Sequence, residues 1–326
     1  MINNIHEQSI ENKTALISGI SGQDGGYLAQ LLLSKGYTVW GTSRDAQTHS
    51  FLNLKKLGIF HRINLVSMIP EDYADVFAVL NKAMPDEVYY LAGQSSVGLS
   101  FEKPAETIQS IVMGALNMLE ACRVLDKNIR FYYACSSECF GDTGEHAANE
   151  KTPFNPTSPY AVAKASAYSI VNNYRTTYNM FACNGILFNH ESPLRSNRFV
   201  THKIIAAAKR IAHGSVETLT LGRMDISRDW GWAPEYVDAM WRMLQLENPE
   251  DFVIATGETH LLEDFVRMAF ATYGLDWHDH VIQSDEFLRP SDAMVSKGDP
   301  NKAKILLGWE ARVNLPQIIE RMILES

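Results

Sequence analysis

The chain has 326 residues, of which 46% are hydrophobic and 21% charged, a composition typical of a globular protein with one large or two closely joined domains. Its formal net charge of −9 argues against general binding to nucleic acids or anionic membranes, because both attract basic surfaces. No apolar run reaches the roughly 18 residues of a membrane span, and polar residues 1–12 lack the basic start and apolar core of a signal peptide.

The cysteines point to a reducing compartment. Cys122, Cys135, Cys139 and Cys183 form no C-x-x-C pair and no Cys/His cluster with metal spacing. We therefore expect no metal site, and reduced, mostly buried thiols in a cytoplasmic protein.

Short apolar runs alternate with segments of helical spacing from residue 14 to residue 188. The runs predict strands at 14–18, 37–42, 63–67, 87–91, 130–136 and 181–188, and the segments between them predict helices at 25–36, 72–82, 104–125 and 158–178. This alternation predicts a parallel, doubly wound α/β sheet of the Rossmann type. Ligands of such sheets bind at the carboxyl ends of the strands.

The alternation weakens after residue 188. A polar loop is predicted at 189–197, helices at 199–213, 234–246, 262–273 and 301–307, and strands at 217–221 and 251–255. We therefore expect a Rossmann domain at 13–188 that also includes about 228–256. A smaller, interleaved C-terminal α/β substrate domain would take 189–227 and 257–326.

A glycine-rich segment joins the first predicted strand to the first predicted helix. It reads G-x-x-G-x-x-G over Gly19-Ile20-Ser21-Gly22-Gln23-Asp24-Gly25. Such glycines permit a tight turn and bring backbone N–H groups close to a pyrophosphate at a helix N-terminus. Glycines also serve ordinary turns, but the position between a strand and a helix favours a dinucleotide site.

The residues after the second strand bear on the choice of cofactor. Arg44 lies about 20 residues past Gly25, where Rossmann folds contact the adenosine ribose. A guanidinium there suits the 2′-phosphate of NADP, whereas Asp45 beside it would repel a phosphate and favours NAD. We expect NADP, with NAD as the alternative.

A tyrosine and a lysine one helical turn apart suggest acid–base chemistry. Tyr160 and Lys164 lie on one face of a predicted helix, and a nearby ammonium lowers the pKa of a phenol. The pair is suited to taking a proton from an alcohol while hydride leaves the same carbon. The hydroxyls of Ser136 and Ser137 could hold that alcohol, and Glu138 supplies a second base. A Tyr-x-x-x-Lys pair alone is more often a surface pair, so its weight comes from these neighbours.

Several segments together resemble a known family. They read G-I-S-G-Q-D-G-G-Y-L-A, L-A-G-Q-S-S-V, S-S-E-C-F-G, S-P-Y-A-V-A-K, A-C-N-G-I-L-F-N-H-E-S-P, R-D-W-G, D-F-V-I-A-T-G, R-P-S-D and G-D-P-N-K-A-K. In these segments the chain resembles the GDP-mannose 4,6-dehydratases of the extended short-chain dehydrogenase/reductase superfamily. The N-H-E-S-P block is more specific to that family than the Tyr-Lys pair, which the whole superfamily shares.

The resemblance implies a lyase that makes a 4-keto-6-deoxy sugar with no net redox change. Tyr160, helped by Lys164, would take the proton of the sugar's 4-hydroxyl as hydride passes from carbon 4 to NADP⁺. Glu138 would then remove the proton on carbon 5, and the carbon 6 hydroxyl would leave as water before hydride returns to carbon 6. Ser136 stands where the family usually has Thr and keeps the hydroxyl.

The resemblance also implies a set of ligand contacts. The cofactor contacts are Gly19, Gly22, Gln23, Asp24, Gly25, Arg44, Leu91, Ala92, Ser95, Tyr160, Lys164, His190 and Arg195. The contacts to a GDP-sugar substrate are Ser96, Ser136, Glu138, Asn189, Lys203, Arg228, Arg289 and Asp292. A homodimer or homotetramer that pairs through the helices at 104–125 and 158–178 is implied as well.

Three positions depart from the family pattern and leave alternatives open. Ser67-Met68 replaces the acidic-apolar pair that usually follows the third strand near the adenine. Arg44-Asp45 stands where the family usually has two adjacent arginines, and Asp292 stands where a Glu is typical. The substrate is therefore GDP-mannose or another GDP-sugar, such as a GDP-manno-heptose. An epimerase or reductase of the superfamily would not need Glu138, and a non-catalytic binding protein would need none of the catalytic groups. The intact groups and the N-H-E-S-P block favour the dehydratase.

Overall fold

The computed structural model describes residues 13–125 and 128–325. Residues 1–12, on which the signal-peptide expectation rests, lie outside this part of the chain. Within the part described, no helix combines the length and apolar character needed to cross a bilayer.

Seven parallel strands form one sheet in the order β11-β6-β5-β4-β1-β2-β3. They are β1 (Thr14–Ser18), β2 (Thr38–Ser43), β3 (Asn64–Ser67), β4 (Glu87–Tyr90), β5 (Arg130–Ser136), β6 (Ala182–Leu187) and β11 (Phe252–Ile254). The predicted parallel α/β sheet is thereby confirmed. The strand order reverses between β1 and β4, so their carboxyl ends border a crevice where such sheets bind ligands.

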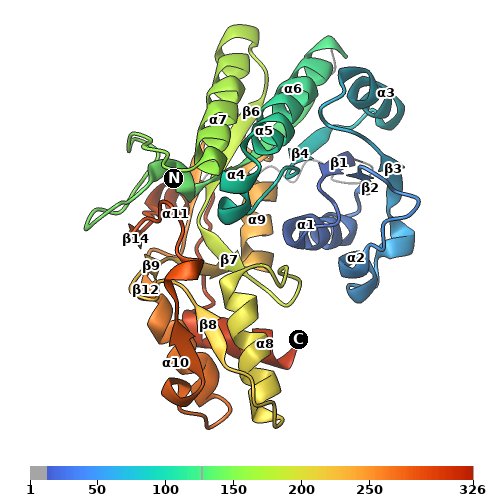
Figure 1. The fold of residues 1–326 in the computed structure, drawn as a ribbon. Coiled ribbons are helices and arrows are strands. Elements are labelled where there is room, and N and C mark those ends of the chain that lie inside the picture. The colour runs from blue at the N-terminus through green and yellow to red at the C-terminus, as the bar shows by residue number, and fades with distance from the viewer. Residues whose placement is uncertain (1–12, 126–127, 326) are drawn as a thin grey trace.

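Helices cover both faces of the sheet, which explains why every residue of β4 and β6 is buried (Figure 1). On one face lie α1 (Gln23–Ser34) and α9 (Ala233–Met243), which pack against each other. On the other face lie α3 (Tyr73–Ala83), α6 (Gly114–Val124) and α7 (Pro159–Tyr178). Further helices are α2 (Leu52–Lys56), α4 (Val97–Glu102), α5 (Pro104–Ile108) and α11 (Asn301–Leu306), with 3₁₀ turns at Phe60–Arg62, Ser137–Phe140, Trp277–Asp279 and Asp285–Phe287.

A separate apolar cluster forms the core of the elements at the bottom of Figure 1. It joins α8 (Val200–Ala212), α10 (Leu262–Ala271) and α12 (Leu315–Leu324) to β8 (Leu219–Leu221) and β13 (Val281–Gln283). A three-stranded sheet of β9 (Ser227–Arg228), β12 (His260–Leu261) and β14 (Val295–Ser296) lies beside it. The chain therefore leaves the main sheet after β6, returns for β11, and leaves again.

Two expectations from the sequence are wrong in part. The polar loop expected at 189–197 begins with a strand, β7 (Asn189–Glu191), which pairs in parallel with β10 (Trp230–Trp232). The helix expected at 104–125 is interrupted by a π-helical segment at Gln109–Met113. Strands of two or three residues show too little alternation to be recognised, and the spacing of apolar residues does not distinguish α from π turns.

Asp229 joins the segment after β11 to the strands β9 and β10. It is fully buried between β9 and β10, and its carboxylate accepts hydrogen bonds from Thr256 N and Oγ1 and from Gly257 N, each at 2.9 Å. Burial disfavours the charged form and raises the pKa of Asp229 to about 6, although these hydrogen bonds oppose the rise. The same residue follows Arg228, so the contact also places that arginine.

We expect the contribution of Asp229 to stability to fall as the pH rises. Its pKa is higher in the folded chain than the usual 3.8, so its contribution is complete below about pH 4 and is lost as the pH passes through 6. Asp229→Asn cannot titrate, so the unfolding free energy of the wild type minus that of the variant should fall by roughly 3 kcal/mol over this range. Urea unfolding at several pH values measures this difference.

Asp225→Asn is the matched control, because Asp225 lies in the same segment with its side chain 61% exposed. Its difference from the wild type should stay within about 0.5 kcal/mol at every pH. A wild-type advantage over Asp229→Asn that grows with pH would contradict the expectation. It would show that the three hydrogen bonds to the carboxylate outweigh the effect of burial.

Candidate active site

The turn between β1 and α1 is built from close backbone approaches. A Cβ at Gly25 would lie 2.3 Å from the carbonyl oxygen of Gly19, and a Cβ at Gly19, whose φ is +93°, would lie 2.9 Å from Ala92 N. Only glycine fits at these two positions. The start of the turn therefore lies against Leu91 and Ala92, which follow β4, and both segments belong to the cofactor site predicted from sequence.

The predicted catalytic groups converge at the carboxyl end of β5. Ser136 ends that strand, and its Oγ accepts a hydrogen bond from Glu138 N at 3.3 Å. Tyr160 and Lys164 lie in the first two turns of α7 and are buried, with 8% and 6% of their surface exposed. Lys164 Nζ donates to the carbonyl oxygen of Ala134 at 2.7 Å and lies 5.7 Å from the centre of the Tyr160 ring. β5 and α7 together therefore assemble all four groups.

Burial controls the charges of this pair. It raises the pKa of Tyr160, and a hydrogen bond with Ser136 only partly opposes the rise. It also lowers the pKa of Lys164, since an ammonium in a dry site is disfavoured. The expectation that Lys164 would lower the pKa of Tyr160 below its usual value is therefore wrong for this structure. The loss of solvent outweighs the attraction of the ammonium, which is directed at Ala134.

Glu138 lies in the same pocket with two arginines and an aspartate near it. Burial raises the pKa of Glu138, the charges of Arg228 and Arg289 oppose the rise, and the charge of Asp292 adds to it. Arg228 Nη2 lies 2.6 Å from Asp292 Oδ1, and Arg289 Nη1 lies 3.7 Å from the same oxygen. A carboxylate with a raised pKa is a stronger base, which suits Glu138 for removing a proton from carbon.

The N-H-E-S-P block holds the glycine-rich turn from the other side. Gln23 Nε2 donates to the carbonyl oxygen of His190 at 3.1 Å, and Ser192 Oγ donates to Gln23 Oε1 at 2.7 Å. Asp24 lies 3.0 Å from His190 Nε2. Arg195 Nη1 donates to the carbonyl oxygen of His190 at 2.9 Å. The cofactor contacts predicted after β1 and those predicted after β6 are therefore joined by hydrogen bonds into one structure.

Two further residues belong to this structure and were not among the predicted contacts. Glu191 is buried, accepts from Thr201 Oγ1 at 2.6 Å, and lies 3.0 Å from Arg195 Nε in an ion pair that lacks hydrogen-bond geometry. Ser192 is the second, through its hydrogen bond to Gln23. Beside the catalytic groups, the carbonyl oxygen of Ala134, which accepts from Lys164, was not predicted either. The N-H-E-S-P block was the available signal for the first two, whereas nothing in the sequence pointed to a backbone oxygen.

Arg44 and Asp45 have different partners. Arg44 Nη2 lies 3.3 Å from Glu71 Oε1, with 61% of the Arg44 side chain exposed. Asp45 accepts hydrogen bonds from its own loop, from Gln47 N at 2.9 Å and from Thr48 N and Oγ1. The bonds from Thr48 lower the pKa of Asp45. The carboxylate of Asp45, which would favour NAD, is thus hydrogen-bonded within its own loop. The guanidinium of Arg44 stays accessible to a ligand.

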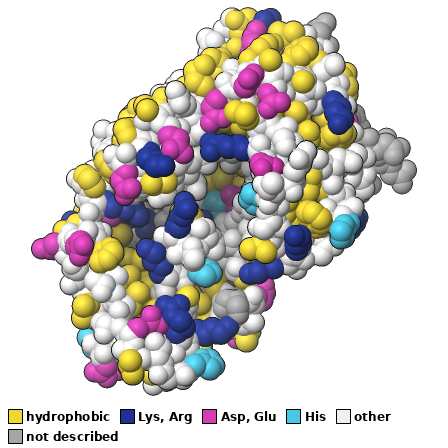
Figure 2. All heavy atoms as spheres, turned by 45° about the vertical axis from the view of Figure 1, so that its right-hand side comes forward, with side chains coloured by type: hydrophobic (Ala, Val, Ile, Leu, Met, Phe, Trp, Pro, Cys, Tyr) yellow, Lys and Arg dark blue, Asp and Glu magenta, His cyan; other side chains and the backbone are white. Residues whose placement is uncertain are grey.

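The remaining predicted contacts have fewer partners within the protein or lie closer to the surface. Ser96 is the N-cap of α4, where its Oγ accepts from Leu99 N at 3.2 Å. Asn189 is half-buried in β7, while Ser95 and Lys203 are exposed. One face of the molecule is hollowed, and Lys and Arg side chains gather around the hollow (Figure 2). An acidic chain therefore still offers positive charge to a phosphorylated ligand.

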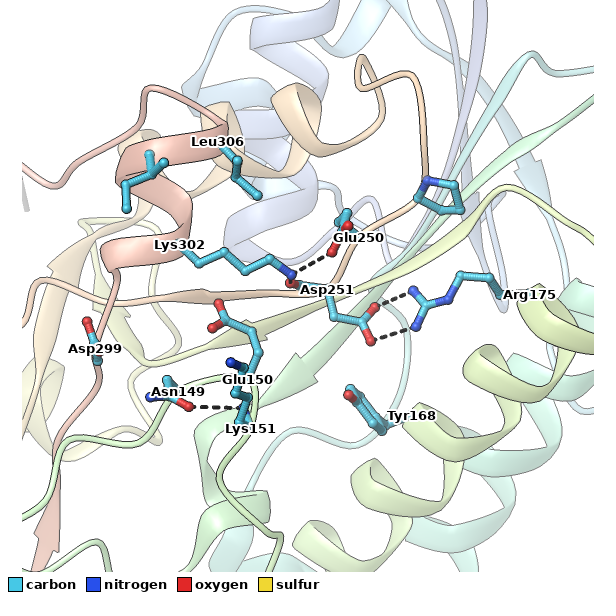
Figure 3. Close-up of a pocket in the computed structure, with 12 residues that line it drawn as sticks. Asn149, Glu150, Lys151, Tyr168, Arg175, Glu250, Asp251, Asp299, Lys302 and Leu306 are labelled. Carbon is cyan, nitrogen blue, oxygen red and sulfur yellow. Dashed lines mark hydrogen bonds and ion pairs between the residues drawn. The ribbon is translucent and has the colours of Figure 1, made fainter. Parts of the chain in front are cut away.

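A second cavity, of about 760 Å³, lies at the other end of the sheet (Figure 3). It opens beside the residues that precede β11, and four of its charged residues form two ion pairs. Arg175 holds Asp251 at 2.7 Å, and Lys302 holds Glu250 at 2.7 Å. None of the predicted site residues lines this cavity. We therefore place the candidate active site at the carboxyl ends of the strands, where the catalytic groups converge.

Comparison with known proteins assigns a family. Residues 16–322 match the family model described as GDP-mannose 4,6 dehydratase. The chain is 44% identical over 324 residues to GDP-mannose 4,6 dehydratase 1 of Arabidopsis thaliana, which covers 96% of this chain and 90% of that protein. It is 41% identical to the GDP-mannose 4,6-dehydratase of Vibrio cholerae, with 96% and 94% covered.

Solved structures share the fold. DesIV, a dTDP-glucose 4,6-dehydratase from Streptomyces venezuelae with NAD and TYD bound, superposes with a TM-score of 0.86 at 19% identity, covering 96% of each chain. RMD from Pseudomonas aeruginosa, complexed with NADPH, gives a TM-score of 0.78 at 20% identity, covering 96% of this chain and 97% of that one. At these identities the likeness supports the fold alone. The family match over nearly the whole chain shows that this protein belongs to the GDP-mannose 4,6-dehydratases, a family of hydro-lyases.

Proposed function

We propose that this protein converts GDP-mannose to GDP-4-keto-6-deoxymannose. The observation that supports this most directly is that Glu138, in the turn after β5, lies close enough to the buried Tyr160 for its charge to contribute to the raised pKa of the phenol. A reductase or epimerase needs only the Tyr160–Lys164 pair. The second base, with the N-H-E-S-P block, supports elimination of water.

A bound nicotinamide cofactor would accept hydride from carbon 4 of the sugar and return it to carbon 6. The residues fit such a group, because the N-cap of α1 is Gly22 and no side chain caps the N–H groups of the first turn, which can therefore face a diphosphate. We propose NADP, since Arg44 is accessible and Asp45 is engaged by its loop. NAD remains the alternative.

The protein's own groups handle the protons. Tyr160 Oη takes the proton of the sugar's 4-hydroxyl, and the hydrogen bond from Ser136 orients that oxygen. The ammonium of Lys164, fixed on Ala134, favours the negative charge that forms on Tyr160. Glu138 removes the proton from carbon 5 and protonates the carbon 6 hydroxyl, which leaves as water. Each such group contributes about 10²–10⁴-fold to the rate.

Arg228, Arg289 and Asp292 would contact the nucleotide-sugar, with Lys203 and Asn189 nearby on α8 and β7. Arg228 is buried and already bound to Asp292. The shorter Asp at position 292 leaves more room than a Glu would. This supports one alternative, a dehydratase for a larger GDP-sugar such as a GDP-manno-heptose.

We also propose two domains. The first comprises 13–188 with about 228–256, and the second comprises 189–227 and 257–326. The apolar clusters support most of this division, because two lie on the faces of the main sheet and the third lies among α8, α10 and α12. Ala303, Leu307 and Trp309 of the second domain pack in the cluster on the α1 and α9 face, and Trp230 and Trp232 of the first domain pack in the third cluster. The four buried and unpaired cysteines support a cytoplasmic location.

The two bases should fail differently when they are removed. In Tyr160→Phe the 4-hydroxyl proton has no acceptor, so no reduced nicotinamide should form. In Glu138→Gln the first oxidation should proceed and then stop, leaving a 4-keto sugar that keeps its carbon 6 hydroxyl. Single-turnover mixing with GDP-mannose, followed by absorbance and mass spectrometry, measures both. Near-normal dehydrated product from Glu138→Gln would show that Glu138 is not the elimination base.

The cofactor should co-purify with the protein, because it is regenerated in every cycle. Nucleotide extracted from denatured protein should be NADP(H), recognised by its mass. Extraction of NAD(H) alone would show that the Arg44–Glu71 pair does not select a 2′-phosphate. The proposed dehydratase activity would still stand, because it needs a nicotinamide and not a 2′-phosphate.

We propose a homodimer or homotetramer formed through α5 to α7. Apolar side chains are exposed along these helices, among them Ile108 (43%), Met113 (42%) and Val124 (46%). The mass measured by light scattering at micromolar concentration should be at least twice the 36.6 kDa of one chain. Met113→Glu should lower it, whereas Leu324→Glu on α12, at a side chain 76% exposed, should not. A monomeric wild type would contradict the proposal.

A further inference from the structure

An acidic side chain lies where the proposed site would hold an anion. Asp24 is in the first turn of α1, at the helix N-terminus that would face the diphosphate of the cofactor. A carboxylate in the first turn stabilises a helix, but it also repels a phosphate. The site therefore requires something that cancels the charge of Asp24.

His190 is placed to do so. Both carboxylate oxygens of Asp24 lie 3.0 Å from its Nε2, and its Nδ1 lies 2.7 Å from the carbonyl oxygen of Phe188. A carbonyl oxygen can only accept, so Nδ1 must carry a hydrogen. An ionised carboxylate can also only accept, so Nε2 must carry one too. This geometry is that of an imidazolium paired with a carboxylate.

The surroundings support both charges. Burial raises the pKa of Asp24, but the charge and hydrogen bond of His190, the hydrogen bond of Gln23 and the charge of Arg195 outweigh it and lower that pKa overall. The Tyr236 ring stacks on His190 with centroids 4.5 Å apart and planes 24° apart, presenting a π face to the cation. The other nearby charge, Arg195, is paired with Glu191.

Both ring nitrogens of His190 are thus occupied inside the protein. The family resemblance implied a cofactor contact for this residue, and the hydrogen bonds of its ring add a positioning role for the imidazole. We propose that Asp24 and His190 form a charge-neutral ion pair that fastens the glycine-rich turn to β7 and keeps the N-terminus of α1 attractive to the diphosphate of a nicotinamide dinucleotide. This inference rests on the proposed cofactor site and adds a specific means of charge compensation.

Charge compensation can be tested with two substitutions and their combination. His190→Gln keeps a side-chain N–H but removes the positive charge, so the exposed carboxylate should weaken NADP⁺ binding about tenfold. Asp24→Asn alone should weaken it less. The double variant Asp24→Asn/His190→Gln should bind more tightly than His190→Gln, because the uncancelled anion is gone. Calorimetric titration of nucleotide-stripped protein with NADP⁺, repeated with NAD⁺, measures each affinity without turnover.

Ser192→Ala is the matched control. It removes the neutral hydrogen bond between Ser192 Oγ and Gln23 Oε1 in the same contact, so adding Asp24→Asn to it should give no recovery. Thermal unfolding of each variant shows whether the fold is kept. Recovery with Ser192→Ala as well, or no recovery with His190→Gln, would overturn charge compensation.

The protonation of His190 can be read directly. The ¹⁵N spectrum of its ring should show two protonated nitrogens at neutral pH in the wild type, and one bare nitrogen in Asp24→Asn. A bare nitrogen in the wild type would overturn the ion pair even if the cofactor binds as proposed. A wild type that bound neither dinucleotide would instead overturn the proposed cofactor site, and this inference with it.

Discussion

The structure depends on one close contact between backbones. The turn after β1 packs against its own first residues and against the start of the segment after β4, leaving no space for a Cβ at Gly19 or Gly25. Because of this contact, the N-terminus of α1 lies at the point where the strand order reverses. The same contact sets the distance at which Gln23 and Asp24 meet the N-H-E-S-P block.

Loss of solvent then determines the chemistry of the pocket. The pKa of Tyr160 and that of Glu138 are raised, and that of Lys164 is lowered, so each group is pushed toward its neutral form. A raised pKa makes the deprotonated form of Tyr160 or Glu138 a stronger base once it has formed. The arginines around Asp292 limit this effect for Glu138. The acid–base groups therefore owe their character to the fold around them as much as to their own chemistry.

Two arrangements of charge separate the functions of the site. Around the cofactor turn, each charge has a close partner within the protein, as with Asp24 and His190 or Arg195 and Glu191. Around the substrate pocket, Asp292 is shared by two arginines, of which Arg289 is exposed. The first arrangement suits a group that stays bound, and the second suits a substrate whose phosphates must be released.

The sequence by itself determined the parallel α/β sheet, the glycine-rich turn and the convergence of Ser136, Glu138, Tyr160 and Lys164. These follow from local periodicity and from the rule that residues after parallel strands share one edge of the sheet. Only the tertiary structure decided the partners of each charge. The sequence predicted that Asp45 would face a ribose, whereas its carboxylate accepts hydrogen bonds from its own loop. The sequence also predicted that Lys164 would lower the pKa of Tyr160, whereas burial raises that pKa. Pairing and desolvation depend on residues distant in the chain, such as Asp24 and His190, and local patterns carry no information about them.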